Sequence, residues 1–394
     1  MSSAVPAGRN CAMNTFAPLI NAWVGRGNFG DELLSYGLRL DLGKVATVPC
    51  ATYYQPGGHP IFTAAGEGMR IATHGGRLPV RLARLLPFLD RLSPYDGLLF
   101  GGGSVLHSAR GLERKSGLVE RYRLARGRRP ALAGCIGVSV GPFDTAADER
   151  AFADFADRLD FIVCRDRSSV DIAASLCRNP RILFGCDLAY GAWAQHSTLF
   201  ARDAEEGLVG VSFLLDRRKP QPYRETALAN MTALVDRLTA GGGRVRLIAL
   251  YIGEKYQDHL LHRQLLGLAR HPERITLHDY AGDVFATIQA IATCSHYLSM
   301  RLHGAICAAL CDIPFLALNR SQKLVDFCAD ARDAGHVADF PDISGDRDAL
   351  LAAADRLLAL PPRGAGGDSR TAIHARGFGH LRDLLGAAPV PVTP

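Results

Sequence analysis

The chain has 394 residues, of which 48% are hydrophobic and 21% charged, and this composition excludes a disordered or collagen-like protein. Single hydrophobic cores stop growing at about 250–300 residues, so the length predicts two domains. The net charge of +6 does not require a nucleic-acid partner, and we expect none. Such a small surplus suits an anionic small molecule or an acidic membrane surface.

The ten cysteines are scattered, with no C-x-x-C pair and no grouping at zinc-ligand spacing. This usage indicates buried thiols in a reducing compartment and predicts no bound metal. The sequence has no run of about 18 apolar residues of the kind that spans a membrane. The stretch over residues 11–20 is a poor signal peptide. We therefore expect a cytoplasmic protein, either free or in peripheral contact with the inner membrane surface.

Short apolar runs alternate with amphipathic stretches, a pattern that predicts an α/β protein with parallel sheets. In chain order, the strands predicted for the first half are residues 18–23, 44–48, 97–100, 131–140, 161–164 and 181–184. Those predicted for the second half are residues 208–214, 244–251, 275–277, 296–299 and 314–318. The predicted helices are residues 31–42, 149–159, 167–176, 224–240 and 258–270, with Asp166 as an N-cap.

The hydrophobic periodicity lapses over residues 191–206, which places a domain boundary there. We predict an N-terminal domain over residues 15–195 and a C-terminal domain over residues 206–335. A linker and a helical tail over residues 360–394 follow, with the helix at 372–385 and a frayed end. Because ligands bind beyond the carboxyl ends of strands in open α/β sheets, the strand–helix junctions are where chemistry is expected.

Two glycine-rich junctions lie in the first half. Residues 25–32 combine glycines with Asn28 and Asp31, which offer hydrogen-bonding groups to a sugar or a phosphate; a tight turn with Asp31 as a helix cap is the alternative. The spacing is not G-x-G-x-x-G, so dinucleotide binding is unsupported. Three consecutive glycines after residues 97–100 suit either a ligand against the backbone or tight packing. His107 behind them is either structural or catalytic.

Two further junctions contain arginine. Arg165 and Asp166 follow a strand of the first half and either pair with each other or leave Arg165 facing a cleft. Asp187 follows the last strand of that half and serves as a helix cap, a hinge or a ligand group. In the second half, Arg301 and His303 stand at a strand end beside the start of a helix. Helix N-termini and arginine forks both favour anions, and histidine titrates near neutrality, so this junction predicts anion binding with acid–base chemistry.

Two other basic features remain open. Lys323, one of five lysines, is predicted in a strand-end loop and contacts either a phosphate or carboxylate, or only solvent. Residues 110–129 carry eight basic side chains against two glutamates. This segment is either a solvated helix face or a contact for an acidic lipid surface or a diphosphate.

Taken together and in order, these motifs resemble the polysaccharide pyruvyl transferase family. The resemblance covers residues 18–330 and rests on Gly27-Asn28-Phe29-Gly30-Asp31-Glu32, Gly101-Gly102-Gly103-Ser104, Arg165-Asp166-x-x-Ser169, Arg301-Leu302-His303-Gly304, Ile313-Pro314 and Lys323. It implies two Rossmann-like domains facing a cleft, as in enzymes of the GT-B type. It also implies phosphoenolpyruvate as the donor, a pyruvate ketal on a sugar of an exopolysaccharide or lipid-linked precursor as the product, and no cofactor.

The resemblance also implies roles for individual residues. His303 and Arg301 are the expected catalytic residues, and Arg301, Leu302, Gly304, Lys323 and Arg165 are expected to bind phosphoenolpyruvate. The N-terminal domain is expected to hold the acceptor through Asn28, Asp31, Gly102, Gly103, Ser104 and His107. The chain departs from the family at Leu214, where many relatives carry an arginine; Arg217 and Arg218 are the nearest replacements.

Two other functions fit the same fold. A nucleotide-sugar glycosyltransferase would need acidic residues in the second domain to bind a ribose, and Asp279 and Asp283 are the candidates. A non-catalytic protein that binds a sugar or an anion is the third hypothesis. The intact Arg301-x-His303 pair argues against it.

Overall fold

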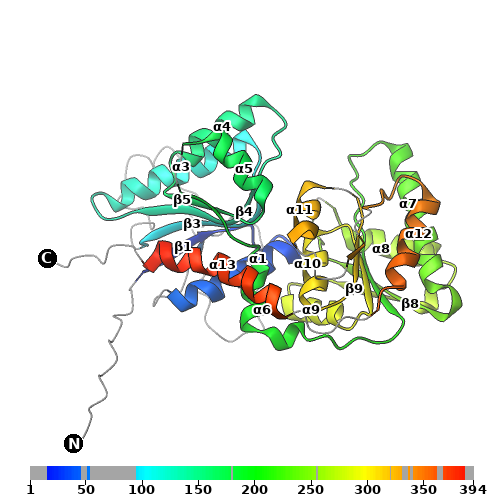
Figure 1. Ribbon diagram of the computed structural model, residues 1–394. Coiled ribbons are helices and arrows are strands. Elements are labelled where there is room, and N and C mark those ends of the chain that lie inside the picture. Colours follow the sequence, from blue (N-terminus) through cyan, green and yellow to red (C-terminus); the bar gives the residue numbers. More distant parts are fainter. Residues whose placement is uncertain are drawn as a thin grey trace, which may run out of the picture.

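The computed structural model describes residues 16–45, 51–53, 95–178, 181–253, 256–319, 321–330, 336–337, 340–361 and 367–386. Within this part the chain forms two six-stranded sheets in which every strand pairing is parallel. Helices pack on both faces of each sheet, and the two layered units lie side by side (Figure 1).

The first sheet has the order β2-β1-β3-β4-β5-β6. Its strands are β1 (Pro18–Asn21), β2 (Ala51–Tyr53), β3 (Gly97–Leu106), β4 (Leu132–Val140), β5 (Phe161–Cys164) and β6 (Ile182–Phe184). One face packs on α3 (Ala109–Arg126), α4 (Ala146–Ala156) and α5 (Arg167–Leu176). The other face packs on α1 (Phe29–Val45), the residues leading into α6 (Ala189–Gln195), and the C-terminal helix α13 (Gly367–Gly386).

One predicted strand of this sheet was wrong, and another is longer than predicted. Lys44 and Val45 were assigned to a strand but form the last turn of α1, where a lysine complements the negative end of the helix dipole. The second strand is β2, and residues 46–48 of the predicted strand lie outside the described residues. The strand predicted over residues 97–100 continues through the three glycines to Leu106, because positive φ at Gly102 and Gly103 bends the backbone without ending its pairing with β4.

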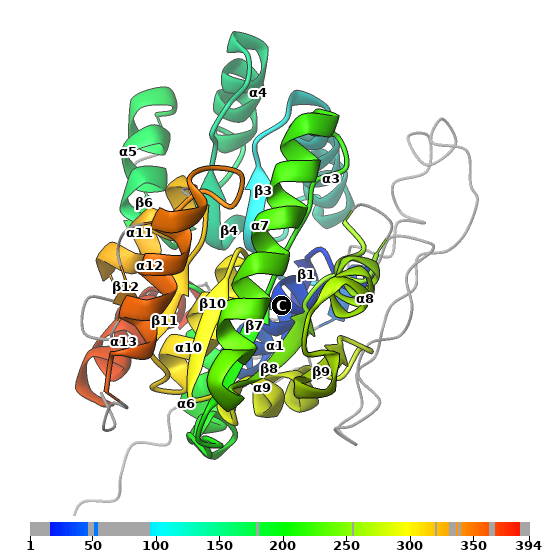
Figure 2. The same ribbon diagram turned by 90° about the vertical axis from the view of Figure 1, so that its right-hand side faces the viewer.

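The second sheet has the order β12-β11-β10-β7-β8-β9. Its strands are β7 (Leu208–Ser212), β8 (Arg244–Ala249), β9 (Ile275–Asp279), β10 (His296–Ser299), β11 (Phe315–Ala317) and β12 (His336–Val337). Side chains alternate between two cores. The outer core packs on α7 (Gln221–Thr239), α8 (Asp258–Leu268) and α12 (Arg347–Leu358), and the inner core on α9 (Val284–Ala292), α10 (Leu302–Leu310) and α11 (Gln322–Asp330). Figure 2 looks onto α7 and α12.

The two units share a core. Phe29, Leu33 and Tyr36 of α1 and the buried residues of α6 belong to the same hydrophobic cluster as α9 and α10 of the second unit. After α12 the chain returns to the first unit as α13, which runs beneath the first sheet in Figure 1. The last residues, 387–394, for which fraying was predicted, lie outside the described residues.

The strand orders locate the sites where ligands are expected. In the first sheet β1 lies between β2 and β3, and in the second sheet β7 lies between β8 and β10, so the direction of chain progression reverses at β1/β3 and at β7/β10. The loops that leave two such neighbouring strands diverge and open a crevice at their carboxyl ends. Both crevices are flanked by predicted site residues.

Candidate active site

A cleft between the two units contains a cavity of about 490 Å³. Its lining includes ten of the predicted site residues: Asn28, Asp31, Gly103, Ser104, His107, Arg165, Arg301, Leu302, His303 and Lys323. Gly102 and Gly304 instead pack behind this wall, with added Cβ atoms meeting Leu34 and Ser299 respectively. The carboxyl ends of strands from both sheets therefore converge on one site.

The glycine-rich loop before α1 docks on the second unit. Phe29 N donates to Leu250 O and Ile252 N donates to Gly27 O, both at 2.9 Å. Helix α1 begins at Phe29 rather than Asp31, and Asn28 Oδ1 accepts the Gly30 N–H at 3.1 Å. Of the two alternatives for this junction, the one with Asp31 as a helix cap was therefore wrong, because the Asn28 side chain accepts the Gly30 N–H in the first turn of α1. Asp31 is free to turn its carboxylate into the cleft, where Asn28 Nδ2 donates to it at 2.5 Å.

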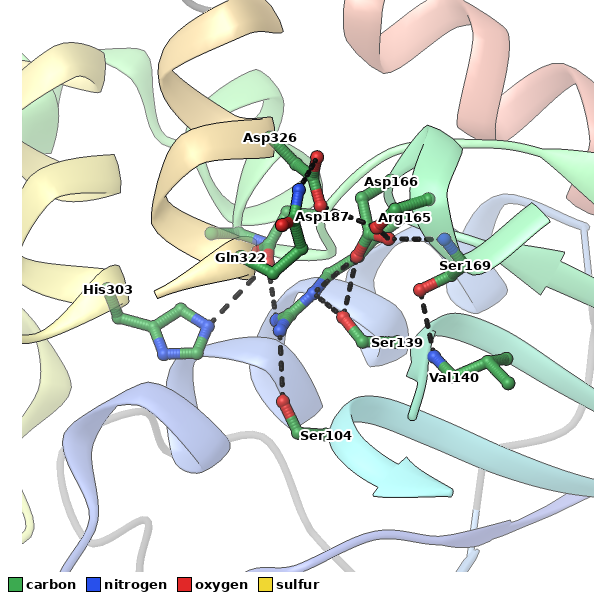
Figure 3. Close-up of polar contacts among 12 residues, drawn as sticks. Ser104, Ser139, Val140, Arg165, Asp166, Ser169, Asp187, His303, Gln322 and Asp326 are labelled. Carbon is green, nitrogen blue, oxygen red and sulfur yellow. Dashed lines mark hydrogen bonds and ion pairs between the residues drawn. The ribbon is translucent and has the colours of Figure 1, made fainter. Parts of the chain in front are cut away.

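His303 lies in the first turn of α10, and its imidazole is held between the two units. Its Nε2 is buried and faces Asp187, with 3.6 Å between Nε2 and Asp187 Oδ2, which is an ion-pair distance but too long for a hydrogen bond (Figure 3). On the other side the ring packs against the backbone of Gly30, where a Cβ atom would come within 2.6 Å of the ring Cγ. Only a glycine at position 30 leaves room for the ring.

Arg165 joins three elements of the first unit. Its guanidinium donates to Ser139 Oγ at 2.7 Å, Asp187 Oδ2 at 3.1 Å and Ser104 Oγ at 3.3 Å (Figure 3). Asp166 caps α5 by accepting the Ser169 N–H at 2.9 Å, as the sequence predicted. Arg165 both faces the cleft and pairs internally, so its charge is largely balanced before any ligand arrives.

Asp187 connects this network to His303. Burial by itself raises the pKa of Asp187, but His303, Arg165 and the Ala189 N–H outweigh it and lower the pKa to about 2. The carboxylate is therefore charged across the physiological pH range. Of the three roles predicted for Asp187, its bond to the Ala189 N–H at the start of α6 fits a cap, and its contact with His303 places it at the site.

Arg301 lies two residues after the end of β10, at the N-cap position of α10, and pairs with a carboxylate that the sequence analysis missed. Its Nε donates to Asp258 Oδ2 at 3.0 Å and its Nη2 to Asp258 Oδ1, a two-point contact with a fully buried side chain. The guanidinium also lies over the rings of Tyr251 and Tyr256, 5.4 and 4.8 Å from their centroids. Asp258 is the first residue of α8, the helix that follows β8. Its position after the carboxyl end of a strand was the signal by which the sequence analysis could have found it.

The two carboxylates at the start of α1 lie in different surroundings. Burial raises the pKa of Asp31, although neighbouring cations act in the opposite direction. Glu32 is buried beside the hydroxyl of Tyr280, which donates to it from the second unit. Burial and the charge of Asp31 raise the pKa of Glu32 to about 8. Glu32 therefore acts between the units and not in the cleft.

The remaining cleft residues differ in exposure. His107 is exposed at the end of β3, and Gly103 approaches Asp31, whose Oδ1 would lie 3.3 Å from an added Cβ. Lys323 lies in the first turn of α11, not in the loop where it was predicted, because α11 already begins at Gln322. Cleft-lining side chains that the sequence analysis did not assign to the site are Trp23, Lys115, Tyr251 and Tyr256.

The candidate ribose-binding residues are engaged elsewhere. Arg263 Nη2 donates to Asp279 Oδ2 at 2.5 Å, and Asp283 caps α9 by accepting the Ala286 N–H at 3.0 Å. The position of the missing family arginine, Leu214, lines the cavity. Its proposed replacement Arg218 is exposed and pairs with Asp216 at 2.7 Å.

Neither a metal site nor a membrane span is found in the described ranges. No group of three or more His, Cys, Asp or Glu side chains there is arranged to hold a metal ion. Among the same residues no helix has the length and apolar character needed to cross a bilayer.

Comparison with known proteins identifies the family. Solved structures with the same fold include the UDP-GlcNAc 2-epimerase of Methanocaldococcus jannaschii in complex with UDP-GlcNAc and UDP, at 8% identity and a TM-score of 0.56, covering 94% of this chain and 99% of that one. The UDP-GlcNAc 2-epimerase of Neisseria meningitidis bound to UDP-GlcNAc is 10% identical, with a TM-score of 0.56, and the match covers 94% of this chain and 99% of that one. This likeness confirms the GT-B-type fold. No functionally curated protein matches the sequence. The family model for polysaccharide pyruvyl transferases matches residues 28–322, a range that includes both sides of the Gly30–His303 contact. This chain therefore belongs to the polysaccharide pyruvyl transferase family.

Proposed function

We propose that the protein transfers the pyruvyl group of phosphoenolpyruvate to a sugar and forms a pyruvate ketal with release of phosphate. One observation carries the proposal. His303 opens the first turn of α10 at a cavity that also contains Arg165, Arg301 and Lys323. Phosphoenolpyruvate carries a phosphate and a carboxylate, and a helix N-terminus surrounded by cations is a suitable place for both.

His303 supplies the proton in this proposal. The imidazole protonates C3 of phosphoenolpyruvate, which becomes the methyl group and leaves an oxocarbenium-like centre at C2. The Asp187 carboxylate, 3.6 Å from Nε2, balances the positive charge of the ring before the proton leaves. Arg301, oriented by Asp258, and Lys323 hold the anionic groups.

The acceptor then closes the ketal. One sugar hydroxyl attacks C2 and loses its proton, the C2–O bond to phosphate breaks, and a second hydroxyl of the same sugar attacks C2 and loses its proton. One of the two hydroxyl protons returns to His303, and the other goes to the released phosphate. Neither a metal nor another cofactor enters this route.

The first unit is suited to the acceptor. Asn28, Asp31 and Ser104 offer amide, carboxylate and hydroxyl groups at the cavity wall, and the exposed ring of Trp23 lies at its edge. Polar groups beside aromatic faces match a sugar, which has hydroxyls on its rim and apolar C–H faces. The acceptor fits best as a sugar of an exopolysaccharide or of its lipid-linked precursor.

Phosphate release tests the proposal. The purified protein is incubated with phosphoenolpyruvate and a panel of galactosides, mannosides and glucosides, free and lipid-linked. We expect phosphate release that depends on the acceptor, and none with nucleotide sugars as donors. His303→Ala is expected to abolish it, whereas the control His271→Ala, on a surface 3-10 turn (Pro272–Arg274) outside the cavity lining, retains it. Turnover of a nucleotide sugar would instead support the glycosyltransferase hypothesis.

A further inference from the structure

The basic segment over residues 110–129 does not act as one surface. Arg126 is buried and pairs with Asp96 at 2.9 Å, and Arg123 pairs with Asp160 at 3.6 Å. Arg114 is exposed to solvent. The basic side chains of this segment therefore differ in their surroundings: some pair within the first unit and others face solvent.

Lys115 differs from the rest of the segment. It is partly buried on α3 and lines the cleft cavity beside His107 and Gly111. Across the described part of the chain no carboxylate forms an ion pair with it. Burial lowers the pKa of its ammonium; the nearby thiol of Cys135 acts in the opposite direction, and the charge of Arg114 adds to the lowering. Among the residues that the structure describes, Lys115 is therefore a partly buried cation of the cavity lining that has no ion-pair partner.

The other cleft arginines show why this matters. Arg165 is balanced by Asp187, and Arg301 by Asp258, each within the protein. A buried charge is costly when it lacks a partner, and an incoming anion removes that cost. Lys115 is thus the position on the first unit where an ion pair with a negative group of a ligand would contribute the most binding free energy.

We propose that Lys115 binds an oxyanion attached to the acceptor sugar, so that the natural acceptor is negatively charged. The inference rests on the proposed function. Lys115 belongs to the same wall as His107 and Ser104, whereas Arg301, His303 and Lys323, which hold the donor in that proposal, come from the second unit. The oxyanion is either the phosphate of a glycosyl phosphate or the carboxylate of a uronic acid.

The test uses the sugar that the phosphate-release panel selects, as its glycosyl phosphate, its uronic acid methyl glycoside and its neutral methyl glycoside. We expect wild-type protein to have the lowest KM for one of the charged forms. Lys115→Met is expected to raise that KM by roughly 10–100-fold, the contribution of one charged hydrogen bond, and to leave the KM for phosphoenolpyruvate and for the neutral form within about twofold. Lys115→Arg restores most of the affinity.

Controls separate the possible failures. Arg114→Met removes a positive charge from the same helix outside the cavity and is expected to leave every KM unchanged. Calorimetric binding of the favoured charged probe to Lys115→Met shows the loss without turnover, and its melting temperature checks folding. The charged form with the lower KM shows whether the oxyanion of the natural acceptor is a phosphate or a carboxylate. A raised KM for phosphoenolpyruvate, equal effects on all three acceptors, or no wild-type preference for a charged form would overturn the inference. If no acceptor in the panel is turned over, the proposed function itself fails.

Discussion

Gly30→Ala tests whether His303 is catalytic in the position that the structure gives it. Gly30 lies in the first turn of α1, and an alanine Cβ there would come within 2.6 Å of the His303 Cγ and 2.9 Å of Cε1. The nearest ring atom, Nδ1, would overlap the Cβ still further. Atoms in contact stay about 3.5–4.0 Å apart, so the ring must move by at least about 1 Å. The open cavity beside it allows that movement, and the contact with Asp187 is then lost.

The effect on activity should be larger than the effect on stability. A displacement of about 1 Å at a reacting group costs on the order of 100-fold in rate, which corresponds to about 2.7 kcal/mol of activation free energy. Alanine in place of glycine inside a helix is worth up to about 1 kcal/mol of stability, because it restricts the unfolded chain. Overpacking against the ring costs about 1–3 kcal/mol, which offsets that gain. Gly30→Ala should therefore lose activity and, unlike an unhindered glycine-to-alanine change, should not gain stability.

The assay is acceptor-dependent phosphate release, with a thermal melt of each variant. Gly43→Ala is the matched control, since Gly43 lies in the same helix and an added Cβ there meets nothing within 4 Å. It should gain stability and keep full activity. A Gly30→Ala variant whose kcat/KM stays within about threefold of wild type would refute the reasoning, because His303 could then be neither held nor used as described.

Two further predictions concern stability. The pKa of Glu32 is raised from 4.5 to about 8, so its contribution to stability is full below about pH 4.5 and is lost as the pH rises through 8, by up to about 5 kcal/mol. Urea unfolding across this range should show that slope for wild type and a flatter one for Glu32→Gln; parallel curves would contradict it. His374→Ala removes the 3.0 Å contact between α13 and the buried Asp41 and should lower the free energy of unfolding by about 2 kcal/mol. An unchanged urea midpoint would show that this contact contributes nothing.

The sequence was sufficient to predict which segments meet at the cleft. Alternating apolar and amphipathic runs specify parallel strands, and the carboxyl ends of parallel strands share one edge. Asn28, Arg165 and His303 each follow such a strand, so their convergence needed no knowledge of side-chain geometry. The capping role of Asp166 was equally local, because an N-cap depends on only three or four neighbouring residues.

Pairings across the fold could not be predicted in the same way. The partner of Arg301 is 43 positions away on α8, and many carboxylates in the chain were equally plausible. The path of β3 through three glycines depends on its pairing with β4, which local propensity does not report. Lys115 looked like part of a solvated face because seven other basic residues surround it in sequence, and only the packing of α3 turns it toward the cavity.

The backbone hydrogen bonds between residues 27–29 and 250–252, together with the core that the two units share, constrain any rotation of one unit against the other. They join backbone to backbone, so they persist whatever side chains the loop carries. A rotation that separates the two units either breaks this short ladder or turns about it as an axis. His303 touches Gly30, one residue beyond the axis, and therefore travels little during such a rotation. Groups far from the axis would move in proportion to their distance, so such a rotation would widen the far side of the cleft while His303 stays beside Gly30.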